Sequence, residues 1–271
     1  MSVLRTWFSQ FVRRLNVGTN PKSHTSMSDP TEEEWAVAKE QLEKATRTAT
    51  LGELGGFRPK NTEDRYTSWW GGNFVGLEGE DLPACDASGN EMLPILQVRT
   101  DELPNVPKWM SGIALMTLWF DPETGHIWEA KNGTGFVIRT YQSLENLVPL
   151  GLGYRQHESL PTFPVSWRSH DLDLPDWEDF ADLIPSSVAR HSESSWFFDH
   201  PGFEARAMLQ QTMPIKLGGY AQWWQSPQEV EGGKFAFFLD STARGSFGFP
   251  AGGSANFFLG THGWEMRVDC A

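Results

Sequence analysis

Short apolar runs separated by turn residues fill the chain from Tyr66 onward. Runs of this length, bounded by glycine, proline or asparagine, are typical of β-strands. We therefore predict strands at 93–98, 235–240 and 254–260, with a last edge strand at 265–270.

Residues 112–141 show the clearest strand pattern. Apolar runs at 112–120, 126–130 and 136–141 alternate with the turn sequences D-P-E-T-G and N-G. Because these turns are short, consecutive strands are expected to pair antiparallel. The segment predicts a three-stranded meander.

The N-terminal part follows a helical period instead. Residues 1–17 place apolar side chains at helical spacing with three arginines among them, which predicts a basic amphipathic helix. Such a helix can dock onto the same protein or a partner, or lie on an anionic membrane surface. A polar linker at 18–28 follows. Asp29 as N-cap and Pro30 at the first helical position then predict a helix within 29–52.

The segment 161–211 differs from the strand-rich parts on either side of it. It is acidic and predicts helices at 175–184 and 201–211, the first ended by Pro185. We expect an acidic helical insert between two β-rich parts.

Charge is concentrated within this insert. Eight carboxylates and one basic residue, Arg190, lie between His170 and His200. The acids at 171–182 alternate with apolar residues, which predicts a helix with one solvated and one packed face. The alternatives are a partner-binding patch and a catalytic carboxyl pair. The candidate partner-binding residues are Asp171, Asp173, Asp176, Trp177, Glu178, Asp179 and Asp182.

Two glycine pairs reveal a repeat. In each case the pair is followed by an apolar strand, an interval and a glycine-led aromatic strand. This order predicts an internal pseudo-duplication with half-units at about 66–150 and 212–271. The predicted fold class is α+β, with an antiparallel β-rich core, a helical N-terminal extension and the acidic insert.

The glycine pairs also suggest a ligand site, because backbone without side chains can approach a ligand closely. A groove between the half-units would be lined by residues near both pairs. The candidate groove residues are Trp70, Gly71, Gly72, Gln97, Gly218, Gly219, Trp223 and Gln225.

Aromatic residues come in adjacent pairs such as Trp69-Trp70, Trp119-Phe120 and Phe237-Phe238. Neighbouring residues of a strand point to opposite faces, so each pair can bury one ring in the core and present the other to a second layer or a partner. Core filling is the interpretation we favour.

The formal charge of -13 at pH 7 argues against nucleic-acid binding, because phosphate would be repelled. Cys85 and Cys270 have no zinc-type spacing and fit a reducing compartment. The chain contains neither a secretory signal pattern nor an apolar run that could span a bilayer. We expect a cytoplasmic protein.

Sequence signatures of catalysis are absent. The chain has no nucleophile elbow, P-loop or H-E-x-x-H, and Gly151-Leu-Gly153 does not complete a dinucleotide fingerprint. Only His170-Asp171-x-Asp173 and Asp199-His200 bring metal-ligand types together, a pattern that is common on solvated surfaces. We expect no cofactor and no metal.

Several short motifs together resemble the bacterial YwqG-like family over residues 69–270. They are S-W-W-G-G at 68–72, the strands at 93–97 and 112–120, K-L-G-G-Y at 216–220 and N-F-F-L at 256–259. The resemblance implies an α+β fold with an internal duplication. Members are often neighbours of secreted toxins, which implies an immunity protein.

The main functional hypothesis is therefore a protein that neutralises a cognate, basic toxin by direct binding. The alternative is a small-ligand-binding protein or enzyme that uses the groove. A third hypothesis is a membrane-surface adaptor acting through residues 1–17.

Overall fold

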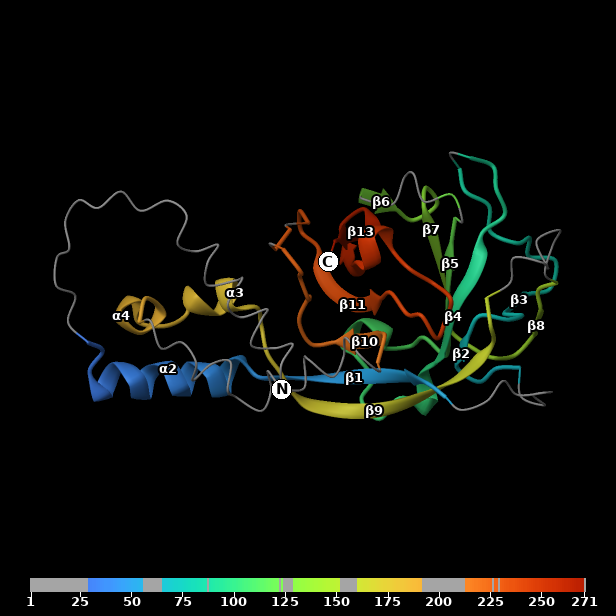
Figure 1. Cartoon of the computed structure of the whole chain (residues 1–271). Helices are drawn as coiled ribbons and strands as arrows, with labels where there is room; N and C mark the ends of the chain where they lie inside the picture. The colour runs from blue at the N-terminus through green and yellow to red at the C-terminus, as the bar shows by residue number, and fades with distance from the viewer. Residues whose placement is uncertain are drawn as a thin grey trace.

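The structure is a computed structural model that describes residues 29–55, 65–86, 88–121, 123, 129–151, 160–191, 213–225, 227–228 and 230–270. The dominant element is one strongly curved antiparallel sheet, and few of the described residues are helical (Figure 1). The fold is α+β with a β-rich core. The helices predicted at 1–17 and 201–211, and the linker at 18–28, lie outside the described residues.

The main sheet of the described chain has eleven strands. They are β1 Arg47–Leu54, β2 Trp69–Trp70, β4 Leu93–Arg99, β5 Leu115–Phe120, β6 Glu129–Lys131, β7 Phe136–Tyr141, β9 Phe163–Asp173, β10 Ile215–Gly218, β11 Lys234–Asp240, β12 Ser254–Gly260 and β13 Gly263–Asp269. A separate pair consists of β3 Val75–Leu77 and β8 Leu147–Pro149.

The strand order is β6-β13-β12-β11-β10-β1-β9-β2-β4-β5-β7, so β1 and β9 form the middle of the sheet. The two edge strands, β6 and β7, are joined by a tight turn. In this turn Asn132 Oδ1 accepts from the N–H of Ile138 at 2.7 Å, and Gly133 N–H donates to the carbonyl of Phe136 at 2.7 Å. The sheet therefore curls into a nearly closed barrel.

The predicted meander is wrong in one strand. β5 pairs directly with β7, whereas β6 pairs with Glu265–Arg267 of β13. The three residues of β6 end at the Asn132-Gly133 turn, and their partner comes from the far end of the chain, which a local pattern cannot reveal.

The N-terminal helix is shorter than predicted. Helix α2 spans Glu32–Ala45 and is capped by Thr31 and Glu34, whose side chains bond to each other's backbone N–H. Residues 47–54 form β1 instead of continuing the helix. The alternation of threonine with Ala49 and Leu51 favours a strand, because β-branched side chains fit a pleated sheet.

The described part of the predicted acidic insert, residues 161–191, is not wholly helical. It begins with β9, an eleven-residue strand that pairs with both β1 and β2 at the centre of the sheet. Two short helices follow, α3 Trp177–Ala181 and α4 Ser186–Ala189. The acidic composition of this segment predicts a solvated helix and masks the alternation at 163–173 that favours a strand.

Aromatic side chains fill the barrel. Trp70 belongs to the main core and its neighbour Trp69 to a second cluster, as the opposite-face prediction requires. Phe237 and Phe257 stack with their ring centroids 4.2 Å apart. In the described part of the chain, no helix is both long and apolar enough to cross a bilayer.

Candidate functional site: an acidic helical lobe and the clasp at its base

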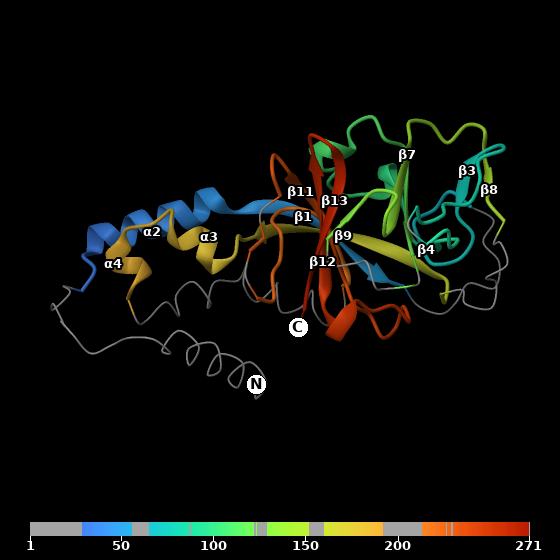
Figure 2. The same ribbon diagram turned by 90° about the horizontal axis from the view of Figure 1, so that it is seen from above.

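Residues 29–46 and 174–191 form a helical lobe that projects beyond one end of the sheet (Figures 1 and 2). The lobe has its own small core, to which α2 contributes Ala38 and Leu42 and the α3–α4 segment contributes Phe180 and Val188. The chain enters the barrel from the lobe through β1 and returns to it through β9. The lobe is thus attached by two necks.

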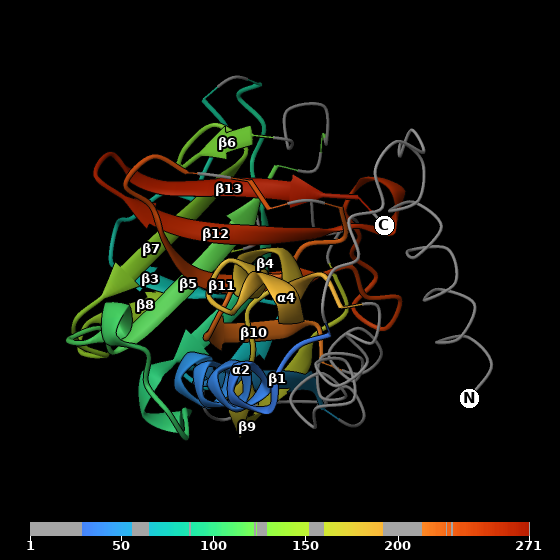
Figure 3. The same ribbon diagram turned by 90° about the vertical axis from the view of Figure 1, so that its left-hand side faces the viewer.

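The surface of the lobe is acidic. Its sequence carries ten carboxylates and three basic residues, in a chain whose net charge is -13. Val37 and Leu183 are also exposed there, at 38% and 56%. Figure 3 looks onto this end of the molecule, with α2 and α4 in front of the sheet. Among the side chains that the structure describes, the exposed carboxylates of the lobe are Asp29, Glu32, Glu33, Glu40, Glu43, Asp179 and Asp182.

The predicted acidic surface is only partly present. Asp179 and Asp182 are exposed on the lobe, and Asp171 is exposed on β9. Asp173 and Asp176 are buried, with 3% and 8% exposure, so they do not belong to this surface. Both were assigned to the solvated face of a helix, but Asp173 ends a strand and Asp176 precedes α3.

The other two predicted residues lie on α3. Trp177 is half-buried and packs against Phe180, with 6.2 Å between the ring centroids. The side chain of Glu178 lies outside the described part of the structure. Trp177 therefore contributes mainly to the packing of the lobe.

Three residues form a clasp at the base of the lobe: Asp173, Lys216 and Tyr220. The ammonium of Lys216 donates to both Asp173 oxygens, at 3.0 and 3.2 Å, and both side chains are buried. The backbone N–H of Tyr220 donates to Asp173 Oδ2 at 2.7 Å. Its hydroxyl donates to the carbonyl of Ala45, and the Arg47 guanidinium lies 4.0 Å from its ring centroid. Tyr220 therefore ties both necks of the lobe to the barrel.

The second glycine pair makes this clasp possible. Gly218 and Gly219 both have φ of +74°, a conformation that glycine adopts without strain. A Cβ on Gly219 would lie 2.1 Å from the Asp173 carboxylate. The pair thus serves as a turn that brings the Tyr220 backbone onto Asp173.

His170 lies beside the clasp on β9. Burial lowers the pKa of His170, the negative charge of Asp173 opposes this, and the positive charge of Lys216 adds to it. Its Nε2 atom is buried and makes no hydrogen bond with the described residues. The clasp therefore has a neutral imidazole next to a buried ion pair.

The structure does not bring the two glycine pairs together. Gly71 and Gly72 lie against residues 160–162, just before β9 begins, whereas Gly219 lies against Asp173, where β9 ends. At about 3.3 Å per residue, β9 separates the two pairs by roughly 33 Å. The prediction of a groove in which one small ligand touches both glycine pairs is therefore wrong.

The polar groups near the first glycine pair already make hydrogen bonds within the protein. Gln97 is fully buried, and its amide donates to the carbonyls of Arg65 and Thr67 and accepts from the N–H of Val75. The indole of Trp70 donates to the carbonyl of Gly245 at 3.1 Å. Both side chains therefore stabilise the fold.

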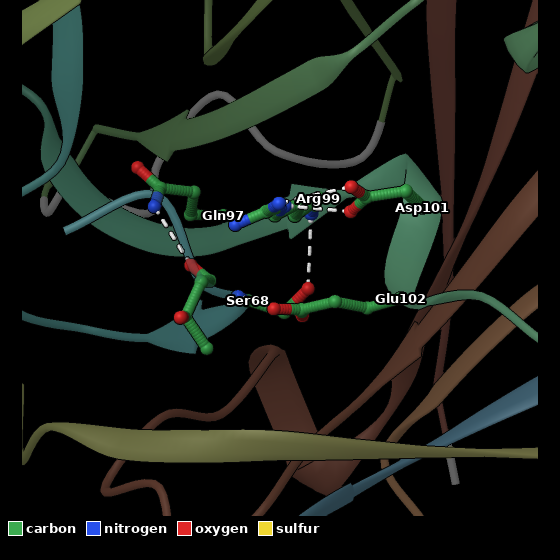
Figure 4. A network of polar contacts seen from close by, with 6 residues as sticks. Ser68, Gln97, Arg99, Asp101 and Glu102 are labelled. Atoms are coloured by element: carbon green, nitrogen blue, oxygen red, sulfur yellow. Dashed lines mark hydrogen bonds and ion pairs between the residues drawn. The ribbon is translucent and has the colours of Figure 1, made fainter. Parts of the chain in front are cut away.

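Figure 4 shows the network in which Gln97 takes part. Ser68 donates its backbone N–H to Glu102 at 3.0 Å, and its hydroxyl accepts from the N–H of Arg99 at 2.9 Å. Arg99 in turn pairs with Asp101, with 2.6 and 2.9 Å between donor and acceptor atoms. The network links the end of β4 to the segment before β2.

Residues 220–225, which we call the strap, cover the outer face of β12 and β13. Trp223 stacks on Phe258, with 6.1 Å between the ring centroids, and Gln222 exchanges two hydrogen bonds with Asn256. The N–H of Gln225 donates to Asp269, while its side chain is exposed. Trp223 and Gln225 therefore hold a surface segment and line no groove with Trp70.

No cluster of three or more histidine, cysteine or acidic side chains suited to a metal ion occurs among the described residues. In comparisons with known proteins, neither a family model nor a curated protein matches the chain. Membership of the YwqG-like family stays a prediction.

Proposed function

We propose that the protein is an immunity-type binding protein that neutralises a basic toxin by direct binding through the helical lobe. The observation that carries this proposal is the lobe itself, which is acidic, projects from the barrel and exposes Val37 and Leu183 among its carboxylates. A projecting surface of this kind fits a concave, basic surface on a partner.

The two kinds of lobe side chain have separate roles in binding. Carboxylates attract a basic partner over a distance and raise the rate of encounter. Apolar side chains contribute affinity once water is excluded from the contact. The clasp supports this role, because it holds the lobe in one orientation. Less conformational entropy is then lost when the lobe binds a partner.

We also infer an internal duplication of the barrel. The strands β2, β4, β5 and β7 follow one another on one side of the β1–β9 pair, and β10, β11, β12 and β13 do so on the other. Each glycine pair lies at the end of the first strand of its series. A duplicated and fused half-barrel accounts for both features.

A cytoplasmic location fits the proposal, since an immunity protein of this kind acts where its toxin would act. Cys85 and Cys270 are both unpaired thiols, which a reducing compartment permits.

The test is co-expression with the toxin-like product of a neighbouring gene, with growth and co-purification as readouts. The double variant Asp179→Lys/Asp182→Lys is expected to lose protection and binding. The matched control is Glu78→Lys/Glu145→Lys, which makes the same charge change on exposed residues beside β3 and β8. The control should protect like the unchanged protein. Equal protection by both variants would contradict docking through the lobe.

A further inference from the structure

A row of three polar side chains lies on the outer face of the C-terminal strands. Asp240 of β11 is directly opposite Ser254 of β12, which is directly opposite Asp269 of β13. Residues opposite each other in antiparallel strands project from the same face. The residues one position inward belong to the main core, so this row faces away from it, on the side covered by the strap.

The row is buried, and one member lacks a partner. Asp240, Ser254 and Asp269 are 4%, 0% and 2% exposed. Asp269 accepts N–H groups of Trp224 and Gln225 from the strap. The Ser254 hydroxyl makes no hydrogen bond with the described residues. Buried hydroxyl groups are normally bonded, so an unpartnered one between two carboxylates indicates that a further atom belongs there.

The two carboxylates also lack an opposing charge. Burial raises the pKa of Asp240 to about 7, and the N–H of Ser241 offsets only part of that rise. Burial likewise raises the pKa of Asp269; the backbone N–H groups of Gln225, Trp224 and Cys270 offset part of that rise, and the charge of Asp176 adds to it. Within the described chain, no basic side chain is among the groups that shift either one. Buried carboxylates in this situation hold a proton or a cation.

We propose that Asp240, Ser254 and Asp269 bind a small, hard metal cation, for which Ca²⁺ is the best-matched probe. All the available ligand atoms are oxygens of carboxylate or hydroxyl groups, which Ca²⁺ prefers. With strands about 4.8 Å apart, the two carboxylates arise on either side of Ser254 and can lean toward it to share one ion. This site is distinct from the helical lobe and does not depend on the proposed toxin binding.

The ion has a structural consequence. Asp269 holds the strap, and the strap carries the clasp residue Tyr220 at its start. Binding of the ion to the carboxylate row would stabilise the folded state by mass action, because the unfolded chain has no such site.

The experiment is calorimetric titration of Ca²⁺ into the chelator-treated full chain, at about pH 8 so that Asp240 is ionised. The unchanged protein is expected to bind one ion with a dissociation constant of about 0.1–1 mM, the range of weak protein sites. Asp240→Asn should weaken binding at least about tenfold. The control Glu231→Gln changes an exposed acid just before the other end of β11 and should bind normally. Absence of binding to the unchanged protein, or equal binding by Asp240→Asn, overturns the proposal.

Thermal unfolding provides a second readout. Asp240→Asn removes an uncompensated buried charge, so it should fold and be at least as stable as the unchanged protein in chelator. Added Ca²⁺ is expected to raise the unfolding midpoint of the unchanged protein but not that of Asp240→Asn. A midpoint that responds to pH and not to Ca²⁺ would show that the row holds only a proton, and would overturn the proposal.

Discussion

Tyr220 donates its backbone N–H to the carboxylate of Asp173 at 2.7 Å, across a separation of 47 residues in sequence. This bond joins the turn made by the second glycine pair to the point where β9 leaves the barrel for the lobe. The hydroxyl of the same tyrosine reaches Ala45, where α2 ends. One residue thus contacts both connections between the barrel and the lobe.

Removing the Tyr220 hydroxyl should loosen the lobe without unfolding the barrel. Tyr220→Phe deletes the bond to Ala45 but keeps the ring and the backbone bond to Asp173. We expect a loss of about 1 kcal/mol in the free energy of unfolding. Hydrogen exchange should become faster in α2 and stay unchanged in β11 and β12. Tyr66→Phe is the matched control, since Tyr66 also donates to a carbonyl, that of Leu147 at 3.1 Å. Unchanged exchange in α2 of Tyr220→Phe would contradict the clasp.

A side chain at Gly219 should be far more damaging than one at another glycine with positive φ. Gly219→Ala combines a left-handed backbone with a Cβ placed 2.1 Å from the Asp173 carboxylate. The expected loss in unfolding free energy is about 3 kcal/mol or more. The control is Gly79→Ala, because Gly79 has φ of +79° and no atom within 4 Å of an added Cβ. We expect it to cost about 1 kcal/mol in denaturant unfolding. Equal losses would show that contact with Asp173 is unimportant.

The neutral state of His170 predicts a loss of stability in mild acid. Burial keeps the pKa of His170 in the folded protein below the ordinary value of 6.5, which the unfolded chain retains. As the pH falls below 6.5, the unfolded chain therefore takes up a proton that the folded protein does not, and stability falls until the folded pKa is passed. The charged groups that act on this histidine are Asp173, Lys216, Arg168 and Asp171.

Unfolding free energies measured across this pH range provide the test. His170→Gln should reduce the slope of unfolding free energy against pH on the acid side by the contribution of one proton. His262→Gln is the matched control, because it replaces a histidine that is exposed in the turn between β12 and β13. An identical slope in His170→Gln and the unchanged protein would contradict the assignment.

Much of the strand content could be predicted from sequence because apolar runs between turns are local signals. The strands at 93–98, 235–240 and 254–260 are present with nearly the predicted bounds. β1 and β9 were missed because their sequences also suit other interpretations. In β1, threonine and alanine come directly after a strong helix signal. In β9, the acidic end suggested a solvated helix.

The site was harder to predict than the fold. The sequence drew attention to Asp173 and Gly219 separately, as a surface acid and a ligand cradle. Only the three-dimensional structure shows that they meet, because β9 and β10 both pair with β1. Lys216 was missed as a functional side chain, although a lysine inside an apolar strand is a signal of a buried ion pair.

The central claim, that the helical lobe is the docking surface, is tested most directly by hydrogen exchange with and without the bound partner. We expect slower exchange in α2, α3 and α4 of the complex, with little change at β3 and β8 at the other end of the molecule (Figure 1). Protection confined to the barrel, with unchanged exchange in the three helices, would contradict docking through the lobe.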